Sequence, residues 1–160
     1  MASGDMLARF MARSASAASL GRHDTRNGHD VVNCASGGTE SFVAQGVLRG
    51  YAGGGLTVKV HTALASATSG NIGISGAFER IGTALDLDAD SFAAAQSLDD
   101  QAVPATSGLV MVSSIPFTDG AQIDSLAEGE AYRLKIAYPN ATTSNAAGDR
   151  QVYAVTIEET

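Results

Sequence analysis

The sequence predicts an all-β protein built as an antiparallel two-sheet sandwich, jelly-roll-like in form. Three observations predict this class: short segments with alternating apolar and polar residues recur from about residue 30, turn-forming residues separate them, and no helical pattern longer than about two turns intervenes. Alternation of this kind is typical of antiparallel sheets that bury one side. Two such sheets packed face to face bury all of these sides together, and an open curled barrel is the alternative.

The most regular strand segment is AYRLKIAY, residues 131–138, in which every second residue is large and apolar. Residues 56–64, LTVKVHTAL, alternate in the same way between apolar and polar side chains. Glycine, asparagine, aspartate and serine gather between such segments, which is the composition of turns. The remaining segments expected to form strands are 29–34, 41–48, 71–81, 109–117 and 151–159.

The same alternation assigns most of the aromatic residues to the core. Phe78, Tyr132, Tyr138 and Tyr153 fall on the predicted inward faces of their strands. Tyr51 is the one obvious loop aromatic, and the chain has no tryptophan. Because ligand sites for sugars are commonly lined by exposed aromatic rings, this distribution disfavours a carbohydrate site and leaves Tyr51 as its candidate.

The first 29 residues differ in composition from the rest. They carry a net charge of +2, whereas residues 30–160 carry −9, and they show no strand pattern. We therefore expect a flexible basic N-terminal arm, residues 1–29, attached to a β-sandwich domain, residues 30–160. The arm either orders on a partner or is a leader without a role. In the first case, the residues expected to bind the partner are Arg9, Phe10, Arg13, Arg22 and Arg26.

The stretch DLDADSFAAAQ, residues 86–96, places carboxylates at every second position before a small apolar run. An EF-hand calcium loop requires glycine at its sixth position and glutamate at its twelfth. Counted from Asp86, these positions are Ser91 and Ser97, so the EF-hand interpretation fails. A looser calcium site from Asp86, Asp88 and Asp90 remains a weak alternative.

Two other interpretations apply to the same stretch. Paired carboxylates can act as catalytic acid and base, but only when they are held across a cleft, and here apolar residues between them indicate a loop with its acids in water. The favoured interpretation is structural. Asp90 or Ser91 caps the N-terminus of a short helix over residues 92–96, because a side-chain oxygen there satisfies free backbone N–H groups.

Charge and hydropathy exclude several classes of protein. A net charge of −7 disfavours nucleic-acid binding, which requires a basic face. No apolar run approaches the roughly 18 residues of a membrane span, and no continuous apolar segment near the start indicates a secretory signal. Only 17% of the residues are charged, so small residues must cover much of the surface. Such a surface loses little side-chain entropy when a neighbour covers it, which indicates assembly.

Motifs for cofactors and catalysis are also missing from the sequence. Cys34 is the one cysteine, so no internal disulfide forms, and no cysteine–histidine cluster offers a zinc site. The glycine-rich stretch at residues 49–58 lacks the Lys-Ser/Thr pair of a phosphate-binding loop. No nucleophile elbow supports a catalytic triad, and His23, His29 and His61 match no common ligand spacing. We expect no cofactor and no enzymatic activity.

Several segments together resemble a family of small β-sandwich structural proteins from tailed bacteriophages and prophages. The resemblance covers roughly residues 42–158 and is most specific at residues 49–55, 77–80, 86–96, 117–121 and 129–134. It implies a virion component of the capsid cement, or decoration, type, with a jelly-roll-like fold. Proteins of that type typically form trimers at three-fold and quasi-three-fold positions of the shell.

The resemblance implies a non-enzymatic protein that is made in the host cytoplasm and binds the outside of the phage head. There it would bridge subunits of the major capsid protein and contact copies of itself in a homotrimer, without nucleic acid or membrane. A phage tail, baseplate or receptor-binding module is the alternative, recognising a host surface glycan through loops near Tyr51 or residues 142–145. A hydrolase with Asp88 or Asp90 beside a second acid is a third hypothesis.

Overall fold

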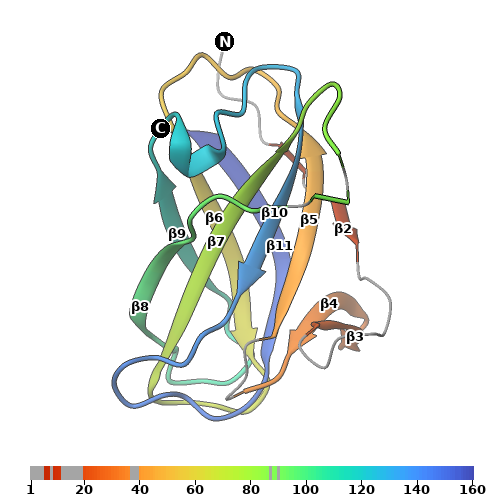
Figure 1. Cartoon of the computed structure of the whole chain (residues 1–160). Helices are drawn as coiled ribbons and strands as arrows, with labels where there is room; N and C mark the ends of the chain where they lie inside the picture. The colour runs from red at the N-terminus through yellow and green to blue at the C-terminus, as the bar shows by residue number, and fades with distance from the viewer. Residues whose placement is uncertain (1–5, 8, 12–19, 37–39, 87, 90) are drawn as a thin grey trace.

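A computed structural model describes residues 6–7, 9–11, 20–36, 40–86, 88–89 and 91–160. This described part contains eleven strands, β1 to β11, and one 3-10 turn, η1 (Ala121–Ile123). No helix in it is long and apolar enough to cross a membrane. All pairings between named strands are antiparallel, and the strands form two sheets (Figure 1). The predicted all-β sandwich is therefore confirmed.

Each sheet is assembled from strands that lie far apart in the sequence. The first sheet has the order β3 (Arg22–Arg26), β4 (His29–Cys34), β11 (Arg150–Glu159), β6 (Leu56–Leu64) and β9 (Met111–Phe117), with β1 (Met6–Leu7) also pairing with β11. The second sheet has the order β2 (Arg9–Met11), β5 (Ser41–Val47), β10 (Ala131–Ala137), β7 (Asn71–Ile81) and β8 (Gln96–Ala102).

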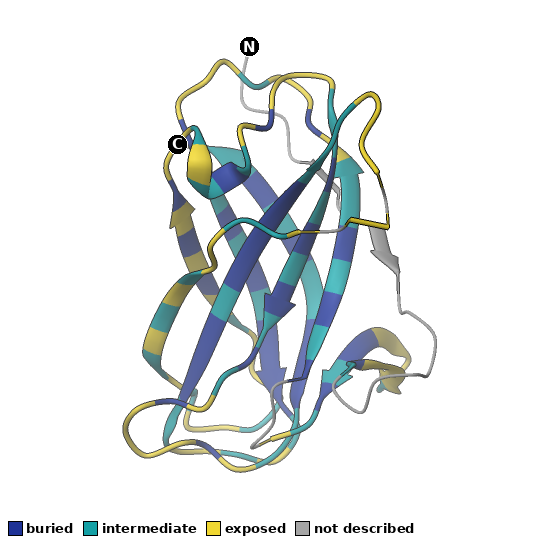
Figure 2. Cartoon of the chain, viewed as in Figure 1, coloured by how far each residue is buried: buried dark blue, intermediate teal, exposed yellow. Residues whose placement is uncertain are grey.

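The core lies between the sheets, and alternate residues of β6 and β10 are buried in it. In β10, every second residue from Tyr132 is buried, as the sequence pattern predicts. Figure 2 shows these buried positions along the inner strands and the exposed positions in the loops. Phe78 of β7 meets Phe117 of β9 edge to face, with ring centroids 4.9 Å apart. This aromatic contact joins the two sheets across the core.

Tyrosine hydroxyls are buried in this core in two different ways. The hydroxyl of Tyr138 lies 2.6 Å from that of Thr62, whereas the hydroxyl of Tyr132 has no hydrogen-bond partner among the described residues. Burial raises the pKa of Tyr132 to about 12. Burial, and after it the nearby charge of Glu40, raises the pKa of the Cys34 thiol to about 12 as well. Both side chains are thus protonated at neutral pH.

The short helix expected over residues 92–96 does not form. Residues 91–95 are irregular, and Gln96 already begins β8. The backbone N–H of Ala93 donates to the carbonyl oxygen of Phe78 (2.8 Å), so it bonds to β7 and not to a helical turn. Figure 1 shows the chain crossing the outer face of the second sheet here. We call residues 91–95 the strap; Ser91 caps no helix, and Asp90 lies outside the described residues.

The ring of Phe92 fixes the strap to this face. Its centroid lies 5.1 Å from the guanidinium carbon of Arg133 and 5.2 Å from the ammonium nitrogen of Lys135, both in β10. Two cations over one aromatic ring give the strap an electrostatic attraction to the sheet. Arg133 also pairs with the buried carboxylate of Glu79 in β7.

The predicted boundary between arm and domain at residue 30 does not match the strands. Arg22–Arg26 form β3 and pair with β4, and the turn between them is Asn27-Gly28, with both residues at positive φ. The backbones of Met6–Leu7 and Arg9–Met11 pair with β11 and β5. The expectation that no strand precedes residue 30 is therefore wrong. That the residues before 20 are flexible in the free protein stays a prediction.

Candidate functional site: two interaction surfaces

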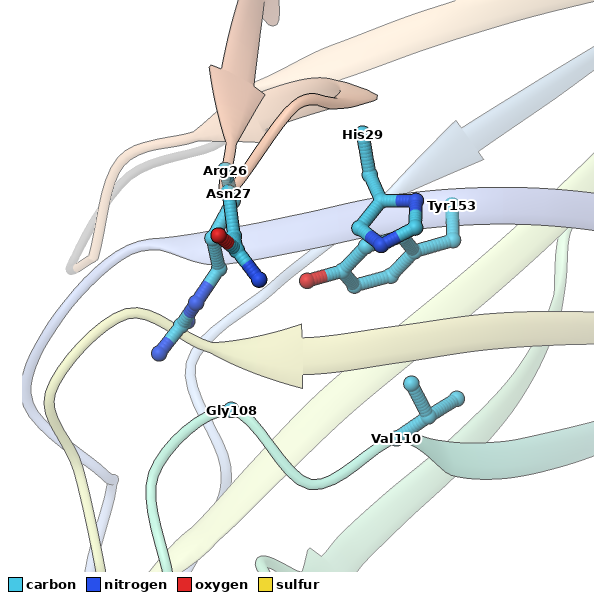
Figure 3. A pocket seen from close by; sticks show the side chains of 6 residues that line it. All are labelled: Arg26, Asn27, His29, Gly108, Val110 and Tyr153. Atoms are coloured by element: carbon cyan, nitrogen blue, oxygen red, sulfur yellow. The ribbon is translucent and has the colours of Figure 1, made fainter.

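A surface pocket of about 390 Å³ lies beside the β3–β4 hairpin at one end of the first sheet (Figure 3). Its position follows from the hairpin, because an Asn-Gly turn reverses the chain tightly and places Arg26 opposite His29. We call it the Arg26 pocket, and the residues that line it are Arg26, Asn27, His29, Gly108, Val110 and Tyr153.

Hydrogen bonds hold Arg26 in this pocket in a fixed position. Its Nη1 donates to the carbonyl oxygen of Leu64 (2.9 Å) and to Oε1 of the buried Gln151 (2.6 Å). Gly108 makes room for the guanidinium, because a Cβ at residue 108 would lie 2.6 Å from Nη2 of Arg26. Among the described residues, no carboxylate oxygen lies within 4.0 Å of this charge. The pocket therefore presents a positioned cation that has no counter-ion among the described residues.

Tyr153 forms the opposite wall of the Arg26 pocket. The sequence pattern placed Tyr153 in the core, but it is half-buried, and its ring meets that of His29 at 6.4 Å and 69°. The physical reason is a β-bulge: the pairing of β11 with β6 shifts between Val152 and Ala154, so Tyr153 has no partner in the ladder. In Figure 3 the hydroxyl of Tyr153 points from β11 toward Asn27 and Arg26.

Exposed aliphatic side chains continue from this pocket into the start of β9. Leu109, Val110 and Val112 are 54%, 50% and 49% exposed, and Val110 also lines the pocket. Val112 is exposed next to the buried Ser113 in β9, so its side chain lies on the outer face of the first sheet. Large apolar side chains gathered at one place on a surface mark interaction sites more often than isolated ones do. The pocket and this aliphatic row form one surface with a basic and an apolar part.

The loop after β7 lies at the other end of the molecule (Figure 1) and presents another exposed apolar side chain. Leu85 is 43% exposed, and the flanking Asp86 and Asp88 are exposed as well. The carboxylate of Asp86 accepts the backbone N–H of Asp88 (3.0 Å), and the N–H of Ala89 donates to the Asp86 carbonyl (3.1 Å). These bonds describe a turn. We call Leu85, Asp86 and Asp88 together the Leu85 loop.

Metal binding at these aspartates receives no geometric support. In the part of the chain that the structure describes, no group of three or more His, Cys, Asp or Glu side chains is placed to hold a metal ion. The third candidate ligand, Asp90, is not among the described residues. What the loop does present is two carboxylates beside an apolar side chain, with no Lys or Arg nitrogen of a described residue within 4.0 Å.

Tyr51, the loop aromatic of the glycan hypothesis, lies in a pocket of about 510 Å³ with Asp119 and Glu128. Its hydroxyl donates to Asp119 (2.6 Å) and accepts the N–H of Gly55 (3.3 Å). Partial burial, followed by the hydrogen bond to Asp119, raises the pKa of Tyr51 to about 12. The N–H of Tyr51 in turn lowers the pKa of Glu128. Tyr51 therefore holds its own loops together, and its hydroxyl is already engaged.

The other loop of that hypothesis, residues 142–145, is tied to β8. The carboxylate of Asp99 accepts hydrogen bonds from the hydroxyl and from the N–H of Thr142, and that of Asp100 accepts the N–H of Thr143. The bonds from Thr142, first of all the one from its hydroxyl, lower the pKa of Asp99. This loop is fixed by acids of its own chain.

The five predicted partner-binding residues are distributed unevenly. Arg22 is exposed in β3, and Arg26 forms the wall of its pocket. Arg9 and Phe10 belong to the backbone pairing of β2, but their side chains lie outside the description, and so does Arg13 entirely. The residues that sequence reasoning missed are Tyr153, Val110 and Val112. The bulge that turns Tyr153 outward left no sequence signal, whereas the Asn27-Gly28 turn could have revealed the hairpin.

Comparisons with known proteins return similar folds at low identity. No protein-family model and no curated protein matches the sequence. A solved structure described as CBM4 has a TM-score of 0.45 at 14% identity, over 96% of this chain and 78% of the other. A variant of a family 29 carbohydrate-binding module has a TM-score of 0.45 at 10% identity, over 98% of this chain and 91% of the other. The structure of the infectious bursal disease virus Gx strain has a TM-score of 0.33 at 9% identity, over 79% of this chain and 32% of the other. Such values transfer neither activity nor partner to this chain.

Proposed function

We propose that this chain is a capsid cement protein, a non-enzymatic virion component that binds the outside of a phage head and bridges subunits of its shell. The observation that carries the proposal is the separation of its exposed large hydrophobic residues. Leu109, Val110 and Val112 lie just before and at the start of β9, at one end of the molecule, whereas Leu85 in the loop after β7 and Val47 at the end of β5 lie toward the other end (Figure 1). A protein that bridges neighbours requires contact surfaces at separate places, and the exposed apolar side chains of the described residues supply them.

The framework between the two surfaces suits a bridge. Long strands of the two sheets close on one continuous apolar core, and the strap holds the outer face of the second sheet. A bridge of this construction transmits force without reorganising, because a close-packed core deforms little. The low charged fraction, 17%, leaves many small side chains that a neighbour can cover at little entropic cost.

The residues before 20 supply the proposed anchor to the shell. They hold Arg9, Phe10 and Arg13, and a basic segment is attracted to an acidic capsid surface. Arg22 and Arg26 belong to β3, so they are part of a strand and not of a free arm. A truncation that tests the anchor must therefore end at residue 19 and keep β3 intact.

The experiment uses shells stripped of this protein and rebinding of the purified chain, measured by co-sedimentation. The full chain is expected to bind to saturation at many copies per shell. Deletion of residues 1–19 is expected to abolish binding while the remaining domain unfolds cooperatively, because it keeps the whole core cluster of the described residues, from Val32 to Ile157. Full binding by the truncated chain would refute the anchor, and no binding by the full chain would refute the cement function.

A second variant tests the apolar surface in the same assay. Val112→Glu places a charge on the aliphatic row and is expected to weaken shell saturation, because neighbouring copies no longer pack against it. Ser97→Glu, at an exposed position of the edge strand β8, is the matched control and should bind as the parent does. Equal binding by both variants would show that the aliphatic row does not contribute to shell binding.

The alternative, a tail or receptor-binding module for a host glycan, makes opposite predictions. It requires few copies per particle and binding of the purified chain to glycans through the pocket beside Tyr51. Tyr51→Ala would then abolish glycan binding. Under this alternative, neither the parent nor the variant would bind stripped shells.

A further inference from the structure

The two exposed apolar surfaces are complementary in charge. The Arg26 pocket combines a guanidinium and His29 with the aliphatic Val110, and the Leu85 loop combines two carboxylates with an aliphatic leucine. Neither the guanidinium nor the two carboxylates has an ion-pair partner among the described residues. In a chain of net charge −7, a positioned cation without a counter-ion is unusual, and it marks where an acidic partner is accepted.

We propose that the Leu85 loop of one copy docks into the Arg26 pocket of a second copy. Leu85 would pack on Val110 and the neighbouring aliphatic row, and the carboxylates of Asp86 and Asp88 would face the guanidinium of Arg26. The amide of Asn27 and the hydroxyl of Tyr153 line the same pocket and supply further donors for carboxylate oxygens. This contact deepens the proposed function, on which its place in the shell rests, by naming one of the bridged neighbours.

The geometry determines the kind of assembly. The loop after β7 and the β3–β4 hairpin that borders the pocket lie at opposite ends of the molecule (Figure 1), so the contact joins two different surfaces and is heterologous. A heterologous contact forms a closed ring when the rotation between copies permits and an open filament when it does not. A ring of three copies would agree with the homotrimer expected from the sequence resemblance.

The acceptor side of the contact is preorganised. The bonds from Arg26 to Leu64 and Gln151 hold the guanidinium before a partner arrives, and the edge-to-face contact with His29 restricts the Tyr153 ring. Groups already held in the bound geometry lose little entropy on association. An isolated surface ion pair adds little affinity, so the apolar contact of Leu85 has to contribute together with the charges.

The test is sedimentation velocity of the full chain over a range of concentrations. The parent is expected to associate, more strongly at low salt than at high salt. Asp86→Asn/Asp88→Asn and, separately, Arg26→Gln are each expected to weaken the association constant by about tenfold or more. Asp24→Asn changes the charge of the same hairpin by one unit at an exposed position outside the pocket, and it should associate as the parent does.

A charge exchange provides the decisive control. Arg26→Glu alone should abolish association, and adding Asp86→Lys and Asp88→Lys to the same chain should restore it, because the signs are complementary again. The aspartate variants lie far from the bonds of Arg26, so they remain informative if Arg26 variants unfold.

Two results would overturn the inference: a monomeric parent, including one whose binding to stripped shells or to a glycan depends on Arg26, or an association that neither set of variants weakens. The failure of the proposed function is separate. Self-association that depends on both surfaces, in a protein that binds no shells, would sustain the contact and refute the cement function. Shell binding by a monomeric parent would sustain the cement function and refute the contact between copies.

Discussion

The ring of Phe92 lies 5.1 Å from the guanidinium carbon of Arg133, and this contact holds the strap on the second sheet. It explains why the acidic stretch before β8 forms no helix. Phe92 is half-buried over two cations of β10, and Ala93 bonds to β7. A helical turn over residues 92–96 would have to give up these contacts.

Replacing Phe92 by alanine is therefore expected to destabilise the fold. The loss of the two cation–π contacts and of the packing beneath the ring should lower the free energy of unfolding by about 1–2 kcal/mol. Urea unfolding followed by fluorescence or circular dichroism measures this. Ser91→Ala, at the exposed neighbouring position, should leave the midpoint unchanged. A urea midpoint of Phe92→Ala equal to that of the parent would show that the ring does not hold the strap.

The ion pair between Arg133 and Glu79 should respond strongly to mutation. Glu79 is 2% exposed, so Glu79→Gln leaves the Arg133 charge largely buried without its carboxylate, at a cost of about 3 kcal/mol. The matched control is Glu158→Gln, which breaks the half-exposed pair with Lys59 and should cost no more than about 1 kcal/mol. Similar urea midpoints for the two variants would contradict the burial argument.

Two tyrosine-to-phenylalanine variants should change the free energy of unfolding by different amounts. Tyr138→Phe removes the hydroxyl that bonds to Thr62 and leaves that buried threonine unpaired, which should cost about 1–2 kcal/mol. Tyr132→Phe removes a buried hydroxyl without a partner, so its effect should be close to zero or stabilising. Equal destabilisation by both variants, measured by thermal or urea unfolding, would show that the Tyr132 hydroxyl has a partner after all.

Stability should fall at alkaline pH. Burial raises the pKa of Tyr132 from 10.0 to about 12 and that of Cys34 from 9.0 to about 12, so the folded state holds both protons more firmly than the unfolded state does. Their contribution is complete below about pH 9 and decreases as the pH rises toward 12. Comparison of urea midpoints at about pH 8 and about pH 11 should show a decrease that is smaller in Tyr132→Phe. An identical decrease in that variant would contradict the assignment.

The sequence predicted the fold well where one face of a strand is buried. Residues 56–64, 71–81 and 29–34 form β6, β7 and β4 with the predicted bounds, and in β6 the alternation of apolar and polar side chains matches alternate burial. Edge strands carry less of this signal. β8 contains Asp99 and Asp100 at its centre, and β3 contains no apolar side chain at all, so neither was predicted.

The candidate site was predicted only in part. Arg26 was named as a partner-binding residue, but as part of a flexible arm and not as the fixed wall of a pocket. The pocket depends on a bulge that turns Tyr153 outward and on Gly108 from a distant loop. Such features arise from the pairing of strands that are far apart in the sequence. Local alternation does not encode which strands pair, and therefore could not reveal them.

The most direct test of the central claim is immunogold electron microscopy of phage particles from the lysate that contains this protein, with an antibody against the purified chain. The account predicts gold over the whole surface of the head, at a density that corresponds to many copies per particle. Gold confined to the tail tip, or no gold on either intact or disrupted particles, would contradict it.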